Sequence, residues 1–453
     1  MLNSTKLGTT SIPKLLATMS APAMLSMLVQ SLYNIVDSIF VAQIGETQLT
    51  AVSLAYPIQM LVFAFAIGIA IGTSSLISRR LGEGKLAEAS HAAQTGLFFA
   101  LISSAFFALF GYGISLGFLM LFTSDAAMLD MSVSYLAIVT SVSVGVFVEL
   151  FCSRTMQSMG NMIIPMISQL IGAITNIILD PIMIFGLIGF PAMGVAGAAV
   201  ATVMGQIAAM VLAIVFNIKF NKELKFDLRK ILPQKRIVAN IYKVGVPSIL
   251  MIAISSVMTF AMNKILIAFT STATAVFGVY FKLNSFLFMP VFGLNNGMVP
   301  IVAYNYGAGK YPRIVKTMKL SIIYAVVIMN LGLIIFQLFP AQLLGLFNAS
   351  PDMIAIGVPA LRIISISFIA AGFSVVTLSV FQALGQGVYS LIVSVSRQLV
   401  ILVPVAYIMS KFENLELIWW SLPIAEIASL LLCIVFMRTT FKKLNIPFTA
   451  KGA

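Results

Sequence analysis

The chain has 453 residues, of which 60% are hydrophobic and only 9% are charged. So much apolar surface cannot be buried inside a water-soluble globule, which excludes ordinary soluble enzymes and binding domains and indicates an integral membrane protein. The net charge of +13 is explained by Lys and Arg residues in the loops that would face an anionic membrane surface, so we expect no nucleic-acid partner.

Apolar runs of about twenty residues or more recur along the whole chain, and each is long enough to cross the hydrocarbon core as an α-helix. Helices satisfy their own backbone groups in lipid, so these runs predict an all-α polytopic protein rather than a barrel. We expect twelve transmembrane helices, at residues 14–44, 50–80, 91–122, 127–157, 161–186, 192–218, 238–270, 274–305, 314–346, 352–384, 388–410 and 416–440.

Lys and Arg residues gather in every second loop, and such residues accumulate on the cytoplasmic side of a membrane. With an even number of helices, this pattern predicts that both termini are cytoplasmic. The basic loops and tails lie in residues 6–14, 79–85, 219–243, 310–319 and 438–451.

An internal repeat becomes visible when the chain is shifted by 225 residues, which matches Pro22 with Pro247. The second span matches best, since residues 68–85 and 293–310 share five identities and the same G-x-G-K ending. This ending lacks the G-x-x-x-x-G-K-[ST] pattern of a phosphate-binding loop and is better explained as a tight turn.

The repeat predicts two pseudo-symmetric lobes of six helices each, both starting in the cytoplasm, as in a two-lobed transporter. We expect an amino-terminal lobe, a basic cytoplasmic linker that is partly an amphipathic helix, and a carboxy-terminal lobe. Their limits are residues 1–216, 217–243 and 244–453.

Ionisable residues inside the spans of the first half are acidic, and such residues are costly in a membrane unless they have a role. Asp37 and Asp180 are each about seven or eight residues from the outer end of their spans, and Asn176 is one helical turn from Asp180. Thr202 lies at a similar depth. Oxygen ligands gathered at one level can hold a proton or a small cation, so we expect these four residues to form a cation-coupling site.

In the second half the residues within spans are basic, and Glu426 is the only acid among them. We expect Glu426 to pair with Lys282 or Arg397, either as a structural pair or as part of a substrate site. The residues that we expect to line a substrate cavity are Tyr33, Asn34, Gln157, Lys282, Arg397 and Glu426.

Cys152 and Cys433 both lie in apolar spans, which gives neither a disulfide framework nor a metal-ligand spacing. The sequence has no H-E-x-x-H or G-x-S-x-G motif, so protease and esterase chemistry is disfavoured. We therefore expect a protein that is not an enzyme and has no cofactor apart from a coupling ion.

Several stretches together resemble the multidrug and toxic compound extrusion (MATE) transporters, in particular their bacterial MepA- and DinF-like group. The resemblance spans nearly the whole chain. Its motifs are Y-N-I-V-D at 33–37, G-T-S-S-L-I-S-R-R-L-G at 72–82, N-I-I-L-D-P at 176–181, G-V-A-G-A-A-V-A-T at 194–202 and P-I-V-A-Y-N-Y-G-A at 300–308.

This resemblance implies an exporter of the bacterial inner membrane that works by alternating access and exchanges H⁺ or Na⁺ for small organic compounds. It also implies an amino-terminal cation site at Asp37, Asn176, Asp180 and Thr202; if the ion is Na⁺, the metal ligands would include Asp37, Asn176 and Asp180. We expect the lipid bilayer and small-molecule substrates as partners, and a monomer.

One departure from the family pattern affects the substrate. Some MATE groups couple through acids in spans 7 and 10, where this chain has Asn263, Lys264 and Arg362. Basic residues on one side of a central cavity would repel lipophilic cations. The alternatives are therefore an exporter of an anionic metabolite, or a flippase for an amphiphilic one, on the same two-lobed scaffold. A channel or a membrane enzyme is a third possibility, which ungated conductance or a covalent product would reveal.

Overall fold

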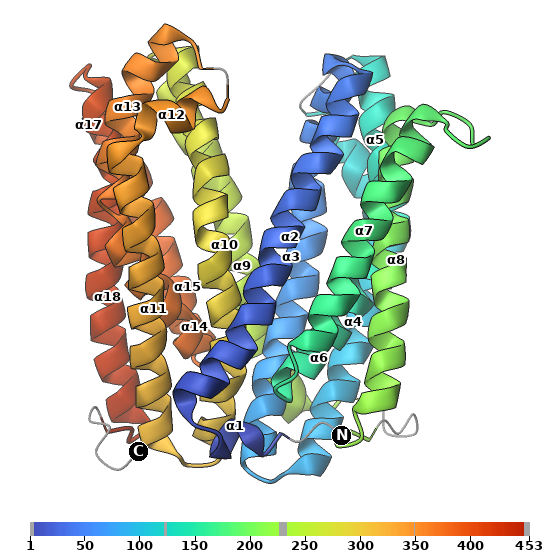
Figure 1. The fold of residues 1–453 in the computed structure, drawn as a ribbon, viewed down its shortest axis with the longest axis vertical. Coiled ribbons are helices and arrows are strands. Elements are labelled where there is room, and N and C mark those ends of the chain that lie inside the picture. The colour runs from blue at the N-terminus through green and yellow to red at the C-terminus, as the bar shows by residue number, and fades with distance from the viewer. Residues whose placement is uncertain (1–3, 122–124, 226–232, 348, 448–453) are drawn as a thin grey trace. The chain divides into compact units, whose positions relative to one another are not determined.

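A computed structural model describes residues 4–121, 125–225, 233–347 and 349–447. Within these ranges the regular structure is helical and contains no strand. Helices in each part of the chain run roughly alongside one another (Figure 1). The predicted all-α architecture is therefore confirmed.

By its contacts the chain divides into two compact units, and the first consists of Met1–Thr9 and Leu25–Ile249. This unit, called unit 1, holds the larger part of α2 and the beginning of α9. Its elements are α1 (Lys6–Thr9), α2 (Ile12–Ile44), α3 (Glu46–Gly82), α4 (Leu86–Leu119), α5 (Ala126–Ser141), α6 (Val144–Ser158), α7 (Ile163–Phe185), α8 (Gly194–Phe220) and α9 (Lys235–Ile267).

The second unit, unit 2, consists of Thr10–Met24 and Leu250–Ala453, so it holds the beginning of α2 and the end of α9. Its other elements are α10 (Ser271–Gly307), α11 (Tyr311–Leu338), α12 (Pro340–Gly345), α13 (Pro351–Ser365), α14 (Phe368–Ala383), α15 (Gly387–Val395), the π-helix η2 (Ser396–Leu402), α16 (Val403–Ser410), α17 (Leu415–Trp419) and α18 (Ser421–Lys443).

Among the residues that the structure describes, ten helical segments are each long and apolar enough to cross a membrane, and two further pairs of helices pass the same test together. The pairs α5 with α6 and α13 with α14 are bent by 46° and 52° at short breaks, so the number of spans is twelve if each pair is one span. The expected span at 314–346 is shorter than predicted, because α11 ends at Leu338 and Pro340 begins α12.

The expected lobes at 1–216 and 244–453 were predicted from the sequence repeat, whereas the two units are defined by contacts within the structure. The limits of the lobes therefore remain a prediction. The units exchange the first parts of α2 and α9, which pass from one unit to the other shortly after Pro22 and Pro247. Of the expected linker at 217–243, residues 217–220 end α8 and residues 235–243 begin α9, while residues 226–232 lie outside the described residues.

The apolar packing of unit 1 explains why polar side chains can be held at one depth. Tyr135 and Leu136 of α5 form one buried cluster with Val41 of α2 and with Ala198 and Ala199 of α8. Elsewhere in the described chain, Cys152 and Cys433 are buried free thiols.

Candidate ion-binding site

Two polar side chains of α7 form the centre of the site. Asn176 and Asp180 are 2% and 0% exposed, and the Asn176 Nδ2 donates a hydrogen bond of 3.2 Å to the Asp180 Oδ1. Their spacing of four residues places both on one face of the helix. Pro181 follows inside α7, and because proline has no amide hydrogen, the carbonyl of Ile177 loses its usual helical donor.

Glycines bring α8 close to this face of α7. A Cβ on Gly205 would lie 2.7 Å from the Gly172 carbonyl oxygen and 3.1 Å from the Asn176 Cβ, so only glycine fits there. At the other end of the contact, a Cβ on Gly197 would collide with the Met183 carbonyl oxygen. Thr202, which is 8% exposed, lies on α8 between these two contacts.

Asp37 reaches the same group of residues from α2. Its charge acts on Asp180, and the charges of both aspartates act on the Tyr33 hydroxyl one turn before Asp37. Asp37, Asp180 and Tyr33 therefore lie within electrostatic reach of one another in unit 1. That Asp37, Asn176, Asp180 and Thr202 form one cation-coupling site stays a prediction.

Two residues that the sequence did not single out complete the site. The Tyr135 side chain of α5 is 2% exposed, and its hydroxyl lies near the side chains of Thr202 and Gln59. A lone tyrosine and a lone glutamine in apolar spans resemble ordinary interface residues in a sequence. Only the packing of α3, α5 and α8 shows that they share one polar group.

The site has acceptor oxygens without donors. Asp37 Oδ1, Asn176 Oδ1 and Asp180 Oδ2 are buried and have no hydrogen-bond partner among the described residues. Buried acceptors are nearly always satisfied, and leaving one unsatisfied costs about 1–3 kcal/mol, more if it is charged. A proton shared by the carboxyl groups would satisfy these oxygens, and so would a small hard cation that binds oxygen ligands.

Other polar residues of unit 1 have local partners. Gln157 accepts a hydrogen bond of 3.1 Å from Arg154 Nη1, and Glu149 accepts one of 2.6 Å from Ser153. Asn34 is exposed, and its backbone carbonyl accepts a hydrogen bond from Ser38. These contacts join Asn34 and Gln157 to neighbours on their own helices rather than to an aspartate of the site.

In unit 2, Glu426 of α18 pairs with Arg397, which confirms the predicted pairing. The distance from Arg397 Nη1 to Glu426 Oε1 is 2.5 Å, and the side chains are 21% and 13% exposed. Lys282 instead lies with its Nζ 5.9 Å from the centre of the Phe347 ring, a cation–π contact. The π-helix η2 carries Arg397, and π-helical turns are frequent at functional sites.

The six residues expected to line a substrate cavity are thus divided between the units. Tyr33, Asn34 and Gln157 belong to unit 1, and the others belong to unit 2, so a cavity shared by all six remains a prediction. Across the described residues, no group of three or more His, Cys, Asp and Glu side chains is arranged to hold a metal ion.

Comparison with known proteins identifies the family. The model of the MatE family matches this chain twice, over residues 22–182 and 247–408, and the two matches begin at the prolines that first revealed the internal repeat. The chain belongs to the MatE family. The MATE resemblance of its motifs is thereby confirmed.

Curated relatives of this MATE chain are bacterial proteins named for multidrug export or multidrug resistance. It is 26% identical to the multidrug export protein MepA of Staphylococcus haemolyticus, over 96% of this chain and 95% of that protein. It is also 26% identical to the probable multidrug resistance protein YoeA of Bacillus subtilis, over 94% of this chain and 93% of that protein. Together with the family match, they show that the chain belongs to a family of multidrug export transporters.

Solved structures of transporters have the same fold as this chain over almost its entire length. A multidrug resistance MATE transporter in an outward-facing conformation has a TM-score of 0.91 and 25% identity, covering 98% of each chain. A Pyrococcus furiosus transporter of the MOP superfamily has the same TM-score, identity and coverage, and its binding pocket is described as having reverse polarity, which suggests a different function. The MATE fold predicted from the sequence is confirmed.

Proposed function

We propose that this MATE protein is an antiporter that exports small organic compounds in exchange for H⁺ or Na⁺, by alternating access. The observation that carries the proposal is the set of buried acceptor oxygens without donors on Asp37, Asn176 and Asp180. A cation bound there would neutralise two nearby carboxylates. Its loss would restore their charges and their repulsion, which gives ion binding an energetic preference between two conformations.

The site residues have distinct parts in this proposal. Asp37 and Asp180 supply the charge that the ion neutralises, and Asn176 orients Asp180 through its amide. Thr202 lies near the Tyr135 hydroxyl and would supply a further oxygen. Because these residues come from α2, α5, α7 and α8, a change in their charge alters the electrostatic interactions of four helices at once.

The setting of the transporter is also part of the proposal. Its basic loops and tails favour a cytoplasmic position for both termini, and its bacterial relatives favour the cytoplasmic (inner) membrane. The site lies wholly within unit 1 of a single chain, which is consistent with a functional monomer.

Transport by purified protein in proteoliposomes tests the proposal directly. Efflux or counterflow of a labelled substrate would be measured under an imposed pH gradient and, separately, under an imposed Na⁺ gradient. One of the two gradients should drive accumulation against the substrate gradient. Accumulation under neither gradient, with substrate binding intact, would contradict ion coupling.

The basic residues of unit 2 favour a second candidate, export of an anionic or amphiphilic metabolite. Lys264, Lys282 and Arg362 have no carboxylate within salt-bridge distance among the described residues, and Glu426 is already paired with Arg397. The Pyrococcus furiosus relative with a pocket of reverse polarity supports this alternative. Competition of a lipophilic cation and of an organic anion for the same transport would decide between the two substrate classes.

A further inference from the structure

Glu149 of α6 is a buried carboxylate that has no part in the ion site described above. It is 7% exposed, and its Oε1 accepts a hydrogen bond of 2.6 Å from the Ser153 hydroxyl one turn later. Within the described residues, no salt bridge joins it to a Lys, Arg or His side chain. An acid inside a membrane span is costly unless it has a role, so this carboxylate requires an explanation.

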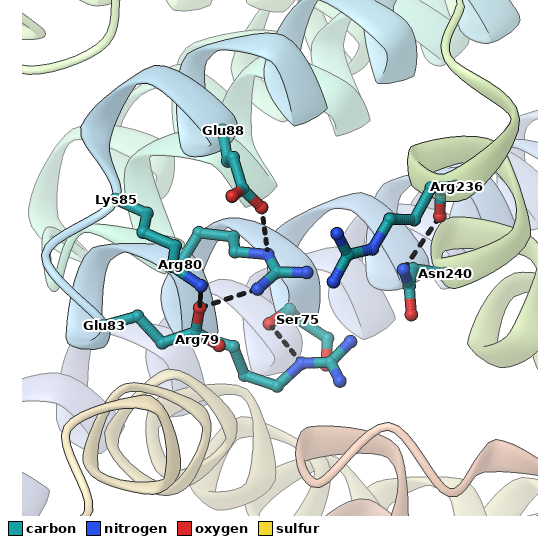
Figure 2. Close-up of polar contacts among 8 residues, drawn as sticks. All are labelled: Ser75, Arg79, Arg80, Glu83, Lys85, Glu88, Arg236 and Asn240. Atoms are coloured by element: carbon teal, nitrogen blue, oxygen red, sulfur yellow. Dashed lines mark hydrogen bonds and ion pairs between the residues drawn. The ribbon is translucent and has the colours of Figure 1, made fainter.

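The acids around the turn from α3 to α4 are of a different kind. Figure 2 shows Glu83 and Glu88 on either side of Arg80, which pairs with them at 2.6 Å and 3.1 Å. The Glu83 carboxylate also pairs with Lys85 at 2.9 Å. These two side chains are 28% and 42% exposed. Glu83 and Glu88 therefore carry their charge beside cations and solvent, whereas Glu149 has neither.

Glu149 lies between the candidate ion site and one end of unit 1. Tyr33 of α2 is one turn before Asp37, and its hydroxyl is within electrostatic reach of both Asp37 and Glu149. Asp180 lies about 26 Å along α7 from the start of that helix, and Glu149 lies about 14 Å before the end of α6, at about 1.5 Å per residue. Since α7 begins shortly after α6 ends, Glu149 is the nearer of the two acids to that end of the unit.

The polar side chains of α7 follow the same direction. Gln169, Asn176 and Asp180 recur at helical spacing, which places them along one face of α7. The Gln169 side chain lies near the Glu149 carboxylate, and Asn176 donates a hydrogen bond of 3.2 Å to Asp180. Polar side chains of α2 and α7 therefore lead from the ion site towards Glu149.

The surroundings of Glu149 allow it to bind a proton. It interacts electrostatically with Arg154 on its own helix, with the Cys152 thiol and with the Tyr33 hydroxyl. The Arg154 Nη1 donates to Gln157 at 3.1 Å. A buried carboxylate that has one hydroxyl donor and no ion pair is neutralised when it takes up a proton.

We propose that Glu149 carries the coupling proton between the ion site and the end of unit 1 where α6 ends and α7 begins. The inference rests on the proposed antiport and narrows its ion to H⁺. Asp37 gives its proton to the Tyr33 hydroxyl, which passes its own proton to the Glu149 carboxylate. Asp37 becomes charged, Glu149 becomes neutral and Tyr33 is unchanged. Glu149 then releases the proton to water and regains its charge.

The direction of this route agrees with the expected orientation of the chain. The basic loops place the end of unit 1 between α6 and α7 in the cytoplasm, so Glu149 would be the last carboxyl before the proton leaves the membrane. A hydroxyl group relays a proton by exchanging one O–H bond for another, which Na⁺ cannot do. The relay is therefore specific for H⁺.

Infrared spectroscopy tests the carboxyl group without any substrate. Difference spectra of the parent in liposomes between acidic and alkaline pH record the carbonyl band of each protonated carboxylic acid. Glu149→Gln should lack one band that the parent has, and Glu88→Gln, which removes an acid already paired with Arg80, should keep it. Glu149→Asp should show this band at a shifted position. Identical bands in the parent and Glu149→Gln would overturn the proposal.

Transport tests whether the proton on Glu149 takes part in coupling. Accumulation of the fluorescent cation ethidium is followed in proteoliposomes under an imposed pH gradient, and radiolabelled benzoate replaces it if the parent transports anions. Glu149→Gln should be slower than the parent by about tenfold or more, since a proton-transferring group contributes about 10²–10⁴ to a rate. Glu149→Asp should recover part of the rate, and Glu88→Gln should match the parent.

Exchange of external for internal ethidium, or of benzoate in its place, without any gradient shows whether the variant is intact. It requires no net movement of protons, so Glu149→Gln should exchange the compound at a rate near that of the parent. A parallel loss of exchange and of accumulation would mean that Glu149 has a structural role, and the relay would be wrong.

The parent protein separates this inference from the proposed function. If a Na⁺ gradient drives accumulation by the parent and a pH gradient does not, antiport stands and the proton relay is wrong. If a pH gradient drives the parent and Glu149→Gln equally, antiport again stands and Glu149 lies outside the route. If neither gradient drives the parent, the proposed antiport fails and the relay fails with it.

Discussion

At the scale of single residues, the ion site depends on two carboxylates that one cation can satisfy. When residues act as a unit, removing one of them removes the function of all. Asp180→Asn should therefore abolish gradient-driven transport. The double variant Asp37→Asn with Asp180→Asn should then be little worse than either single variant. Initial rates of substrate uptake in proteoliposomes measure this, and multiplicative losses in the double variant would show that the aspartates act independently.

The ion pair of unit 2 can be tested through stability. Removing either charge leaves its partner in a partly buried place, so Arg397→Gln and Glu426→Gln should each lower the free energy of unfolding by about 1–3 kcal/mol. A fully buried pair would cost more, but these side chains keep 21% and 13% of their surface exposed. The double variant should recover part of the loss in a thermal unfolding assay. Simple addition of the two losses would mean that the pair contributes no coupling energy.

Much of the site could be predicted at this scale, and what was missed has a physical reason. An aspartate inside an apolar span is costly, so Asp37 and Asp180 stand out in the sequence alone. Tyr135 and Gln59 do not, because either is tolerated in many apolar surroundings and only its contacts reveal a role. Glu426 was recognisable as half of an ion pair, but the choice of Arg397 over Lys282 needed the geometry of η2 and α18.

At the scale of elements, the contact of α7 with α8 sets the geometry of the site. Gly205→Ala would place a Cβ 2.7 Å from the Gly172 carbonyl, so the helices must separate, at a cost of about 1–3 kcal/mol in stability. Gly113→Ala is the control, because a Cβ on this exposed glycine of α4 meets nothing within 4 Å. That change should leave stability equal or raise it, since alanine favours a helix over glycine. Equal unfolding temperatures for both variants would contradict the close packing.

The turn between α3 and α4 gives a prediction about pH. Burial opposes ionisation of Glu83, but hydrogen bonds from Lys85 and Arg80 and their charges outweigh it and lower its pKa below the ordinary value of 4.5. The pairing therefore contributes fully to stability above pH 4.5 and is lost as pH falls through the lowered pKa.

Thermal unfolding across this acidic range checks the prediction. The parent should lose more stability on acidification than Glu83→Gln, and the difference at neutral pH should be at most about 1 kcal/mol, as for other surface pairs. Identical pH profiles for the two proteins would show that the Glu83 carboxylate gains nothing from Arg80 and Lys85.

At the scale of the whole molecule, the sequence was most informative about the number and placement of helices. Span length and the 225-residue repeat depend on the bilayer and on the chain itself, so they can be read without a structure. The breaks within two spans could not be predicted from the sequence, because α5 with α6 and α13 with α14 bend without a proline at the break. The exchange of the first parts of α2 and α9 between units depends on long-range contacts, which a repeat does not record.

Transport by Asp37→Asn in proteoliposomes tests most directly whether Asp37 converts an ion gradient into export. This variant should fold, bind substrate and yet fail to accumulate it under an imposed H⁺ or Na⁺ gradient, because its site can no longer change charge. Asp130→Asn, which alters an exposed aspartate of α5, should transport like the parent. Gradient-driven accumulation by Asp37→Asn at a rate near that of the parent would show that Asp37 does not couple the ion gradient to export.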